Sequence, residues 1–285
     1  MKTVGVLVNV QKPRAAEVLA RLDVLTREAG LTLICDDSAS RFIDTAETMS
    51  TEAMLDRMDV LMALGGDGSM LKAVRVLDGR DKPVIGVNVG SLGFLTSVAE
   101  HDLEGAVSCL ASDDYRTSER SLISCQARRD GTVGETYRAL NDVVIRSDSP
   151  RVITLELLVD GEMVCSYVCD GMIVSTPTGS TGHNLSANGP ILHPEARVLL
   201  VTLLCPHTLS SRPLVLTDQS VIAVKVVNFS GSISFTVDGQ VGEPLGQDSI
   251  LEMSMSDQRV KFIHLPDYSY FRVLRHKLGW RGSSV

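Results

Sequence analysis

Long apolar runs, excess positive charge and repeats are all missing from this sequence of 285 residues. No apolar run reaches the roughly 18 residues needed to cross a bilayer, so no membrane-spanning helix is predicted. The formal net charge of −8 and the pI near 5.3 argue against broad nucleic-acid binding, which needs a basic face. No internal repeat or low-complexity segment is found. The sequence therefore predicts neither a membrane nor a nucleic acid as partner.

Paired cysteines at metal-ligand spacing are also lacking. The six cysteines lie mostly within apolar runs, and no second pair accompanies Cys165 and Cys169, which excludes an ordinary zinc site. The first nine residues contain one lysine and a short apolar run, followed at once by polar residues, so they predict a strand and not a signal peptide. We therefore expect reduced, buried thiols in a cytoplasmic protein: Cys35, Cys109, Cys125, Cys165, Cys169 and Cys205.

The first third of the chain alternates between strand and helix patterns. Such alternation predicts a parallel sheet with helices on both faces. The apolar pattern predicts strands at 4–8, 31–34, 59–64 and 83–88, and helices at 15–29, 44–57 and from 70 onward.

After about residue 99 the pattern changes to β, with Asp-Gly turns at 160–161 and 238–239. Strands are expected at 143–145, 153–159, 162–168, 172–174, 221–227, 233–237 and 249–255. Apolar residues at helical spacing predict that 267–280 packs back onto the body. We therefore expect an α/β domain over 1–98, completed by 265–285, and a β-rich domain of paired or stacked sheets over 99–264.

The stretch from Leu64 to Lys72, Leu-Gly-Gly-Asp-Gly-Ser-Met-Leu-Lys, lies between a predicted strand and a predicted helix. Its glycines permit close approach of a ligand to the backbone, and the helix N-terminus that follows suits a phosphate. Asp67 is unusual in such a turn, because its negative charge would repel a phosphate bound at the glycines. Two interpretations are open: Asp67 serves the chemistry, as a base or a metal ligand, or it caps the helix.

A second glycine cluster, at 86–95, also follows a strand, so both loops are expected at the carboxyl edge of one sheet, where ligands of open α/β folds bind. Its spacing departs from the Gly-x-Gly-x-x-Gly fingerprint, which makes an ordinary dinucleotide-dependent dehydrogenase a poor fit. In the β-rich half, the hydroxyl-rich stretch 175–181 is interpreted as a binding loop for ribose hydroxyls, phosphates or an amide, in preference to a polar surface turn. The pair Asn141-Asp142, at a strand entrance, is by itself only a turn.

Taken together, these motifs resemble the NAD kinase family along most of the chain. The matching stretches, in order, are 65–71, 86–95, 140–145, 170–171, 175–181, 188–190, 206–213 and 267–280. The resemblance implies an α/β domain, a β-rich domain, and a final segment that returns to the first. It also implies transfer of the γ-phosphoryl group of ATP to the 2′-hydroxyl of the adenosine ribose of NAD, with a divalent metal such as Mg²⁺, in a homodimer or homotetramer.

The same resemblance assigns site residues. Asp67 matches the proposed general base. Contacts to the nucleotides are implied for Asp67, Gly68, Lys72, Asn88, Asn141, Asp142, Arg151, Val168, Asp170, Thr178, Thr181, Gly182, His183, Asn184, Leu185, Ser186 and Gln240. This chain departs from the usual pattern at Gly182-His183, where Ala-Tyr is common, at Asp142, where many members have Glu, and at Ser69, where Thr is common.

Two rival hypotheses remain at this point. A lipid or small-alcohol kinase of the diacylglycerol kinase type shares the Gly-Gly-Asp-Gly turn but leaves the hydroxyl-rich loop and the tail unexplained. A dinucleotide-binding regulator without turnover would keep the pocket, although retention of Asp67 argues against it.

Overall fold

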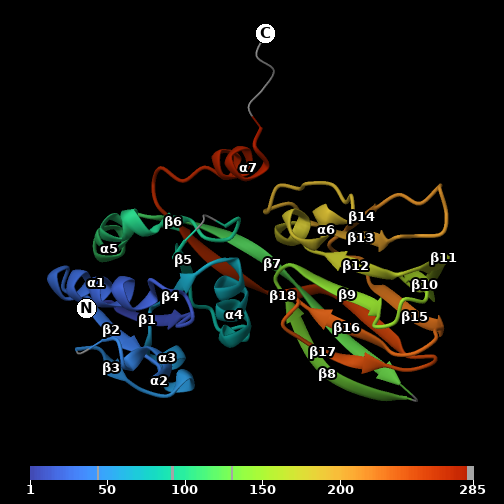
Figure 1. Cartoon of the computed structure of the whole chain (residues 1–285), viewed down its shortest axis with the longest axis horizontal. Helices are drawn as coiled ribbons and strands as arrows, with labels where there is room; N and C mark the ends of the chain where they lie inside the picture. The colour runs from blue at the N-terminus through green and yellow to red at the C-terminus, as the bar shows by residue number, and fades with distance from the viewer. Residues whose placement is uncertain (44, 91–92, 130, 281–285) are drawn as a thin grey trace, which may run out of the picture. The chain divides into compact units, whose positions relative to one another are not determined.

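A computed structural model gives the fold and describes residues 1–43, 45–90, 93–129 and 131–280. The chain forms two compact units (Figure 1). The first unit contains residues up to Glu119 and those from Val260 onward, and the second contains Arg120–Arg259. The first unit therefore extends beyond the expected boundary at residue 98. None of the described helices has both the length and the apolar character needed to cross a lipid bilayer.

The first unit is built on a parallel sheet in the order β3-β2-β1-β4-β5-β6. Its strands are β1 (Thr3–Val8), β2 (Thr32–Cys35), β3 (Glu47–Thr48), β4 (Val60–Gly65), β5 (Val84–Asn88) and β6 (Val98–Ala99). Its helices are α1 (Ala15–Glu28), α2 (Asp37–Ser40), α3 (Thr51–Arg57), α4 (Asp67–Leu77), η1 (Glu100–Asp102), α5 (Leu103–Ser112) and α7 (Tyr270–Leu278).

Helices cover both faces of this sheet, as the alternating pattern predicts. Alternate strand residues such as Val4 and Val6 belong to a core that includes apolar side chains of α1 and α5. On the other face the sheet carries glycines: a Cβ on Gly5 would lie 2.7 Å from Met58 Sδ, and one on Gly86 would lie 2.6 Å from Met70 Sδ. The absence of side chains at these glycines lets the methionines pack directly against the strands.

Two expected segments of the first unit differ from the structure. The helix expected over 44–57 is wrong in its first half, since β3 pairs with β2 at Glu47 and Thr48 and the helix begins only at Thr51. Ser50 fixes that start, because its hydroxyl accepts the amide of Ala53. Residue 44 lies outside the described residues. The expectation of β structure from residue 99 is also wrong, because α5 packs its buried residues Leu103, Ala106, Val107 and Leu110 onto the sheet.

The second unit consists of stacked antiparallel sheets around one apolar core. One sheet has the order β14-β13-β12-β9-β16-β17, and β11-β10-β15 with the first part of β18 forms another. The strands are β7 (Arg116–Arg129), β8 (Thr132–Ala139), β9 (Asp142–Ser147), β10 (Ile153–Val159), β11 (Glu162–Cys169), β12 (Gly171–Ser175), β13 (Val198–Leu204), β14 (Leu214–Thr217), β15 (Ile222–Asn228), β16 (Ile233–Val237), β17 (Val241–Leu245) and β18 (Ile250–His264). Two short helices, η2 (Thr178–Thr181) and α6 (His183–Ser186), follow β12.

Both predicted Asp-Gly turns are confirmed. Asp160 and Gly161 have φ of 53° and 82°, and Asp238 and Gly239 have φ of 53° and 63°, as the left-handed residues of a two-residue hairpin require. The expectation of buried thiols is wrong for Cys165 and Cys205, which are exposed, whereas Cys35, Cys125 and Cys169 are buried. All six thiols are free.

Candidate functional site

The glycine turn of the first unit joins the end of β4 to the start of α4 (Figure 1). Gly65 has φ of +155°, and a Cβ there would lie 2.0 Å from the hydroxyl of Ser69. A side chain is therefore excluded at Gly65 by both conformation and space. Gly68, in the first turn of α4, has open space where its Cβ would be. Gly66 and Gly68 place no side chain over the first turn of α4, and a helix N-terminus of this kind suits a phosphate.

Asp67 is the first residue of α4, and its carboxylate binds a neighbouring loop. It accepts the amides of Phe94 and Leu95, each at 2.9 Å. A Cβ on Gly93 would lie 1.9 Å from Asp67 Oδ1, so this loop approaches the carboxylate as closely as glycine allows. Among the described residues, no side chain caps α4 by a hydrogen bond. The structure thus favours a positioned carboxylate over a helix cap.

The second glycine cluster lies at the same sheet edge as the first. Asn88, at the end of β5, is paired with Gly65, at the end of β4, and is only 2% exposed. Its Nδ2 donates to the hydroxyl of Thr96 at 3.4 Å, and that hydroxyl also accepts the amide of Gly93 at 3.1 Å. The two loops expected at one carboxyl edge are therefore brought together, while residues 91–92 of the cluster lie outside the described residues.

Positive charge near Asp67 comes from α4 and from the tail. Lys72 is exposed on α4, whereas Arg75, also exposed, lies in the last turn of the helix, at the end away from Asp67. Lys277 of α7 places its Nζ 5.5 Å from the centre of the Phe94 ring, next to the loop that holds the Asp67 carboxylate. Sequence reasoning did not single out Lys277. The signal was the cluster of basic residues in the last turn of a helix that was expected to return to the body.

In the second unit, a polar pocket of about 350 Å³ opens beside the start of β9. Its lining residues are Asn141, Asp142, Val144, Arg146, His183, Thr236, Asp238 and Gly239. Three of the expected contact residues, Asn141, Asp142 and His183, are thus brought together. Gly182 lies beside them, since a Cβ there would be 3.5 Å from Asn141 Nδ2 and 3.9 Å from Asp142 Oδ2.

The hydroxyl-rich loop packs against the segment 140–141. The Thr176 hydroxyl donates to the carbonyl of Leu140 at 2.6 Å, and the Ser175 hydroxyl donates to the carbonyl of Asn141 at 3.1 Å. Gly179 approaches so closely that its Cβ would lie 2.1 Å from the Asn141 carbonyl oxygen. These hydroxyls, expected as ligand contacts, are instead turned inward and stabilise the loop.

Two polar atoms, one on a residue of the pocket lining and one in η2, are buried without a hydrogen-bond partner. They are Asn141 Oδ1 and Thr178 Oγ1, neither of which has a hydrogen bond within the part of the chain that the structure describes. An unpaired buried acceptor or donor costs about 1–3 kcal/mol. A bound ligand with complementary groups would remove this cost.

Asn184 has a different environment from its neighbours. Its side chain is fully buried, donates to the carbonyls of Ser180 and Pro190 at 3.2 Å each, and accepts the Thr202 hydroxyl at 2.7 Å. Its amide group therefore holds the turn after η2 in place. Around it, Thr181 and Leu185 are partly exposed and Ser186 is exposed.

Two side chains of the pocket have shifted pKa values. Burial, and then the charge of Asp238, raise the pKa of Asp142 to about 7. The pKa of His183 is lowered by partial burial of the ring and then by the charge of Arg146. Both effects favour the neutral form of the imidazole.

The remaining expected contacts lie outside the lining of this pocket. Arg151 is exposed before β10, and Gln240 is exposed after the Asp238-Gly239 turn. Asp170 is exposed between β11 and β12, where it hydrogen-bonds the Cys205 thiol and raises its pKa. Val168 lines a separate groove of about 440 Å³ together with residues of the 206–213 motif, His207 and Arg212 among them.

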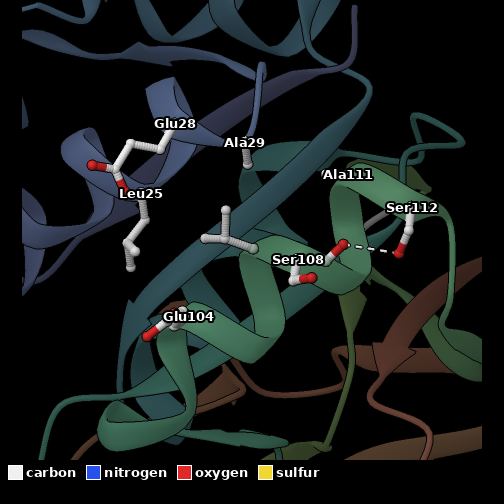
Figure 2. A pocket seen from close by; sticks show the side chains of 8 residues that line it. Leu25, Glu28, Ala29, Glu104, Ser108, Ala111 and Ser112 are labelled. Atoms are coloured by element: carbon white, nitrogen blue, oxygen red, sulfur yellow. Dashed lines mark hydrogen bonds between the residues drawn. The ribbon is translucent and has the colours of Figure 1, made fainter.

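A third hollow lies in the first unit between α1 and α5, with a volume of about 430 Å³ (Figure 2). Its lining residues are Leu25, Glu28, Ala29, Glu104, Val107, Ser108, Ala111 and Ser112. This described lining contains two carboxylates and no lysine or arginine, so it does not suit a phosphate. The hydroxyl of Ser112 is bonded to the carbonyl of Ser108 at 2.9 Å (Figure 2).

Comparison with known proteins decides the family. Sequence models of the ATP-NAD kinase N-terminal and C-terminal domains match residues 4–115 and 140–265. The chain belongs to the NAD kinase family. An NAD kinase of Geobacter metallireducens is 37% identical over 281 residues, covering 98% of this chain and 99% of the relative. An NAD kinase of Heliobacterium modesticaldum is 39% identical over 283 residues, with the same coverage.

Solved NAD kinase structures share the fold. A yeast NADH kinase complexed with NADH aligns with a TM-score of 0.92 over 100% of this chain and 89% of that chain, at 23% identity. An NAD kinase from Archaeoglobus fulgidus in complex with ATP aligns with a TM-score of 0.77 over 99% and 100%, also at 23% identity. As an NAD kinase, the chain is a phosphotransferase that converts NAD to NADP with ATP. The match over residues 140–265 includes the hydroxyl-rich loop that a lipid-kinase assignment left unexplained.

Proposed function

We propose that Asp67 is the general base of this NAD kinase, accepting the proton of the 2′-hydroxyl of the adenosine ribose as that oxygen attacks the γ-phosphorus of ATP; the bond from the γ-phosphorus to the bridging oxygen breaks and ADP leaves. The observation that carries the proposal is the fixed carboxylate at the start of α4, held by the amides of Phe94 and Leu95. Phosphoryl transfer depends chiefly on positioning and on electrostatic stabilisation, so a held base beside a glycine turn is sufficient protein chemistry.

The phosphates of ATP are proposed to bind at the glycine turn. Gly68 lies in the first turn of α4 with open space at its Cβ position, and the helix N-terminus offers partial positive charge. Lys72 is close in sequence and exposed. Asn88, buried at the same sheet edge, keeps the second loop in place through Thr96.

NAD is proposed to bind at the pocket of the second unit. The unpartnered atoms Asn141 Oδ1 and Thr178 Oγ1 suit hydroxyl or amide groups of a dinucleotide. His183 offers a neutral ring for stacking, and Asp142 offers a carboxyl group to a ribose hydroxyl. Further contacts are proposed at Arg151, Val168, Asp170, Thr181, Gly182, Asn184, Leu185, Ser186 and Gln240.

A magnesium ion is proposed to accompany ATP. In the described residues, no group of three or more His, Cys, Asp or Glu side chains could together hold a metal ion. This fits the chemistry of Mg²⁺, which is usually bound by substrate phosphates, water and one or two carboxylates. When bound, the ion would neutralise phosphate charge, and Asp67 is the carboxylate beside the glycine turn that could contact it.

We also propose a cytoplasmic homodimer or homotetramer. The free thiols fit a reducing compartment. The edge strand β11 exposes Met163, Val164 and Val168, apolar side chains that a second copy could cover.

The test measures NADP formation by purified protein with ATP, Mg²⁺ and NAD, read with an NADP-specific dehydrogenase. We expect Asp67→Asn to lose activity by a factor of about 10² to 10⁴, the usual contribution of a positioned base. Asp78→Asn is the matched control, because it makes the same change at the other end of α4, where Asp78 has φ of 43° and asparagine is tolerated.

The binding step is followed by the NAD-induced rise in melting temperature, which Asp67→Asn is expected to retain. Wild-type rates of NADP formation by Asp67→Asn would refute the base assignment. Product from a lipid substrate and none from NAD would restore the lipid-kinase hypothesis, and an NAD-induced melting shift without product would restore the regulator hypothesis.

A further inference from the structure

The Asp238-Gly239 turn between β16 and β17 lies against the segment 140–142, which precedes and begins β9. The turn is closed by the amide of Gln240, which donates to the carbonyl of Val237 at 3.0 Å. The adjacent amide of Asp238 donates to the carbonyl of Asp142 at 2.9 Å. A backbone hydrogen bond thus ties the hairpin turn to the polar pair at the pocket.

The side chain of Asp238 adds a second and stronger connection. Its Oδ2 accepts the amide of Leu140 at 2.9 Å, and its Oδ1 accepts the amides of Asn141 at 2.7 Å and Asp142 at 3.2 Å. Three successive peptide groups therefore point at one carboxylate. Hydrogen bonds to an ionised acceptor are about twice as strong as neutral ones, so this segment is firmly held.

The carbonyl groups of the same segment are held from the opposite side. Thr176 binds the carbonyl of Leu140 through its hydroxyl, and its amide donates to the carbonyl of Asn141 at 2.8 Å. Asp238 thus fixes the amide side of 140–142 and the hydroxyl-rich loop fixes the carbonyl side. The side chains of Asn141 and Asp142 project from a backbone that has little freedom to move.

This arrangement has an electrostatic cost. Asp238 and Asp142 are both carboxylic acids lining one pocket, and the charge of Asp238 contributes to the raised pKa of Asp142. A hairpin turn by itself does not need such a neighbour, because asparagine is equally suited to this backbone conformation. The turn itself thus does not require a carboxylate at position 238, and what distinguishes Asp238 is the three amides that it accepts.

We propose that Asp238 is a positioning residue of the NAD site, whose carboxylate holds the amides of 140–142 so that Asn141 and Asp142 are in place before NAD binds. This inference rests on the proposal that NAD binds at the pocket of the second unit. Asp238 acts through the backbone of the segment and is assigned no contact with the reacting atoms.

The variant that tests this is Asp238→Asn, which preserves the size of the side chain and suits the turn, but removes the charge and leaves one oxygen to accept hydrogen bonds. We expect KM for NAD to rise about tenfold, the effect of losing one strong hydrogen bond. We expect kcat to change less than threefold and KM for ATP to stay constant. A role in turn formation alone would change none of these.

The matched control is Asp160→Asn. Asp160 occupies the same position of an Asp-Gly hairpin turn in the same unit, with the same φ of 53°, and its carboxylate accepts the amide of Val221 at 2.8 Å, away from the pocket lining. We expect its KM and kcat to match the wild type. An unchanged KM for NAD in Asp238→Asn would overturn the inference while leaving NADP formation by the wild type, and thus the proposed function, intact.

A second measurement uses the wild type and needs no variant. Amide hydrogen exchange at 140–142 is followed with and without NAD. We expect these amides to be protected already in the free protein, with little further protection on adding NAD. Protection that develops only with NAD would overturn the inference, since the segment would then be ordered by its ligand.

Discussion

Asp142 shows how a single residue acquires properties that its sequence position does not reveal. Its side chain is 5% exposed at the start of β9, and burial followed by the charge of Asp238 raises its pKa to about 7, from an ordinary value of 3.8. In the unfolded chain the same carboxyl would ionise near 4. Protonation of Asp142 is therefore coupled to folding.

The coupling predicts a pH dependence of stability. Between about pH 4 and pH 7 the folded protein keeps a proton that the unfolded chain releases, so the free energy of unfolding falls as the pH rises through this window. Asp142→Asn removes this effect. The quantity to compare is the free energy of unfolding of Asp142→Asn minus that of the wild type. We expect this difference to increase by on the order of 2–4 kcal/mol from pH 4 to pH 7 and to stay constant above pH 7.

Urea unfolding at several pH values measures this difference. Asp257→Asn, at an exposed position of β18, provides the baseline variant. A stability difference between Asp142→Asn and wild type that is constant from pH 4 to pH 8 would contradict the prediction.

His183 predicts a difference in NAD affinity at the same scale. Its ring lines the pocket, and partial burial and then the charge of Arg146 lower its pKa, which favours the neutral form. A tyrosine ring would offer more stacking area at this position. We expect His183→Tyr to lower KM for NAD by about three- to tenfold. His193→Tyr, at an exposed position outside the pocket lining, is the control, and an unchanged or higher KM in His183→Tyr would count against the stacking role.

At the scale of elements, the N-terminus of α4 depends on a loop that is distant in sequence. The loop donates the amides of Phe94 and Leu95 to Asp67, and Gly93 makes the approach possible because even a methyl group would overlap Asp67 Oδ1. The position of the proposed base is thus set jointly by a helix and by the loop that follows β5. A helix alone would leave the Asp67 side chain free to rotate.

Gly93→Ala tests this dependence. We expect kcat to fall by a factor of about 10 to 10², because a displacement of the base by about 1 Å has effects of this size. The control is Gly105→Ala in α5, where a Cβ has open space and a helix gains up to about 1 kcal/mol from the replacement. The measurement is the kcat of NADP formation by each variant at steady state. Full activity of Gly93→Ala would show that the position of the base does not depend on this loop.

The sequence predicts most elements but misses those that local patterns describe poorly. Local signals predict the strands at 4–8 and 233–237 and both Asp-Gly turns. The strands follow from the pattern of apolar residues, and the turns follow from residues that adopt left-handed conformations. The helix α5 was not predicted, because the pattern after residue 99 indicates β structure, although the buried residues of α5 recur at helical spacing. The short strand β3 exists only because β2 lies beside it to pair with.

At the scale of the whole molecule, the division into units does not follow the order of the chain. The first unit consists of two separate stretches, up to Glu119 and from Val260 onward, and β7 and β18 each contribute residues to both units. Within the first unit, Phe262 of β18 pairs with Val84 of β5, and α7 follows. The tail helix was predictable from its spacing, but the point at which the chain returns was not, because the strand expected over 249–255 continues without a turn to His264.

The sequence by itself determined the family, the α/β and β-rich halves, the glycine turn and the set of candidate site residues, because these depend on residue types in a fixed order. Only the tertiary structure decided how those residues are used. In the folded chain the Asp67 carboxylate accepts the amides of Phe94 and Leu95. The hydroxyls of Ser175 and Thr176 bind backbone carbonyls, and the Asp238 carboxylate accepts three amides. The physical reason is that a hydrogen bond joins groups that are close in space, and no local pattern records which distant backbone amide a carboxylate will meet.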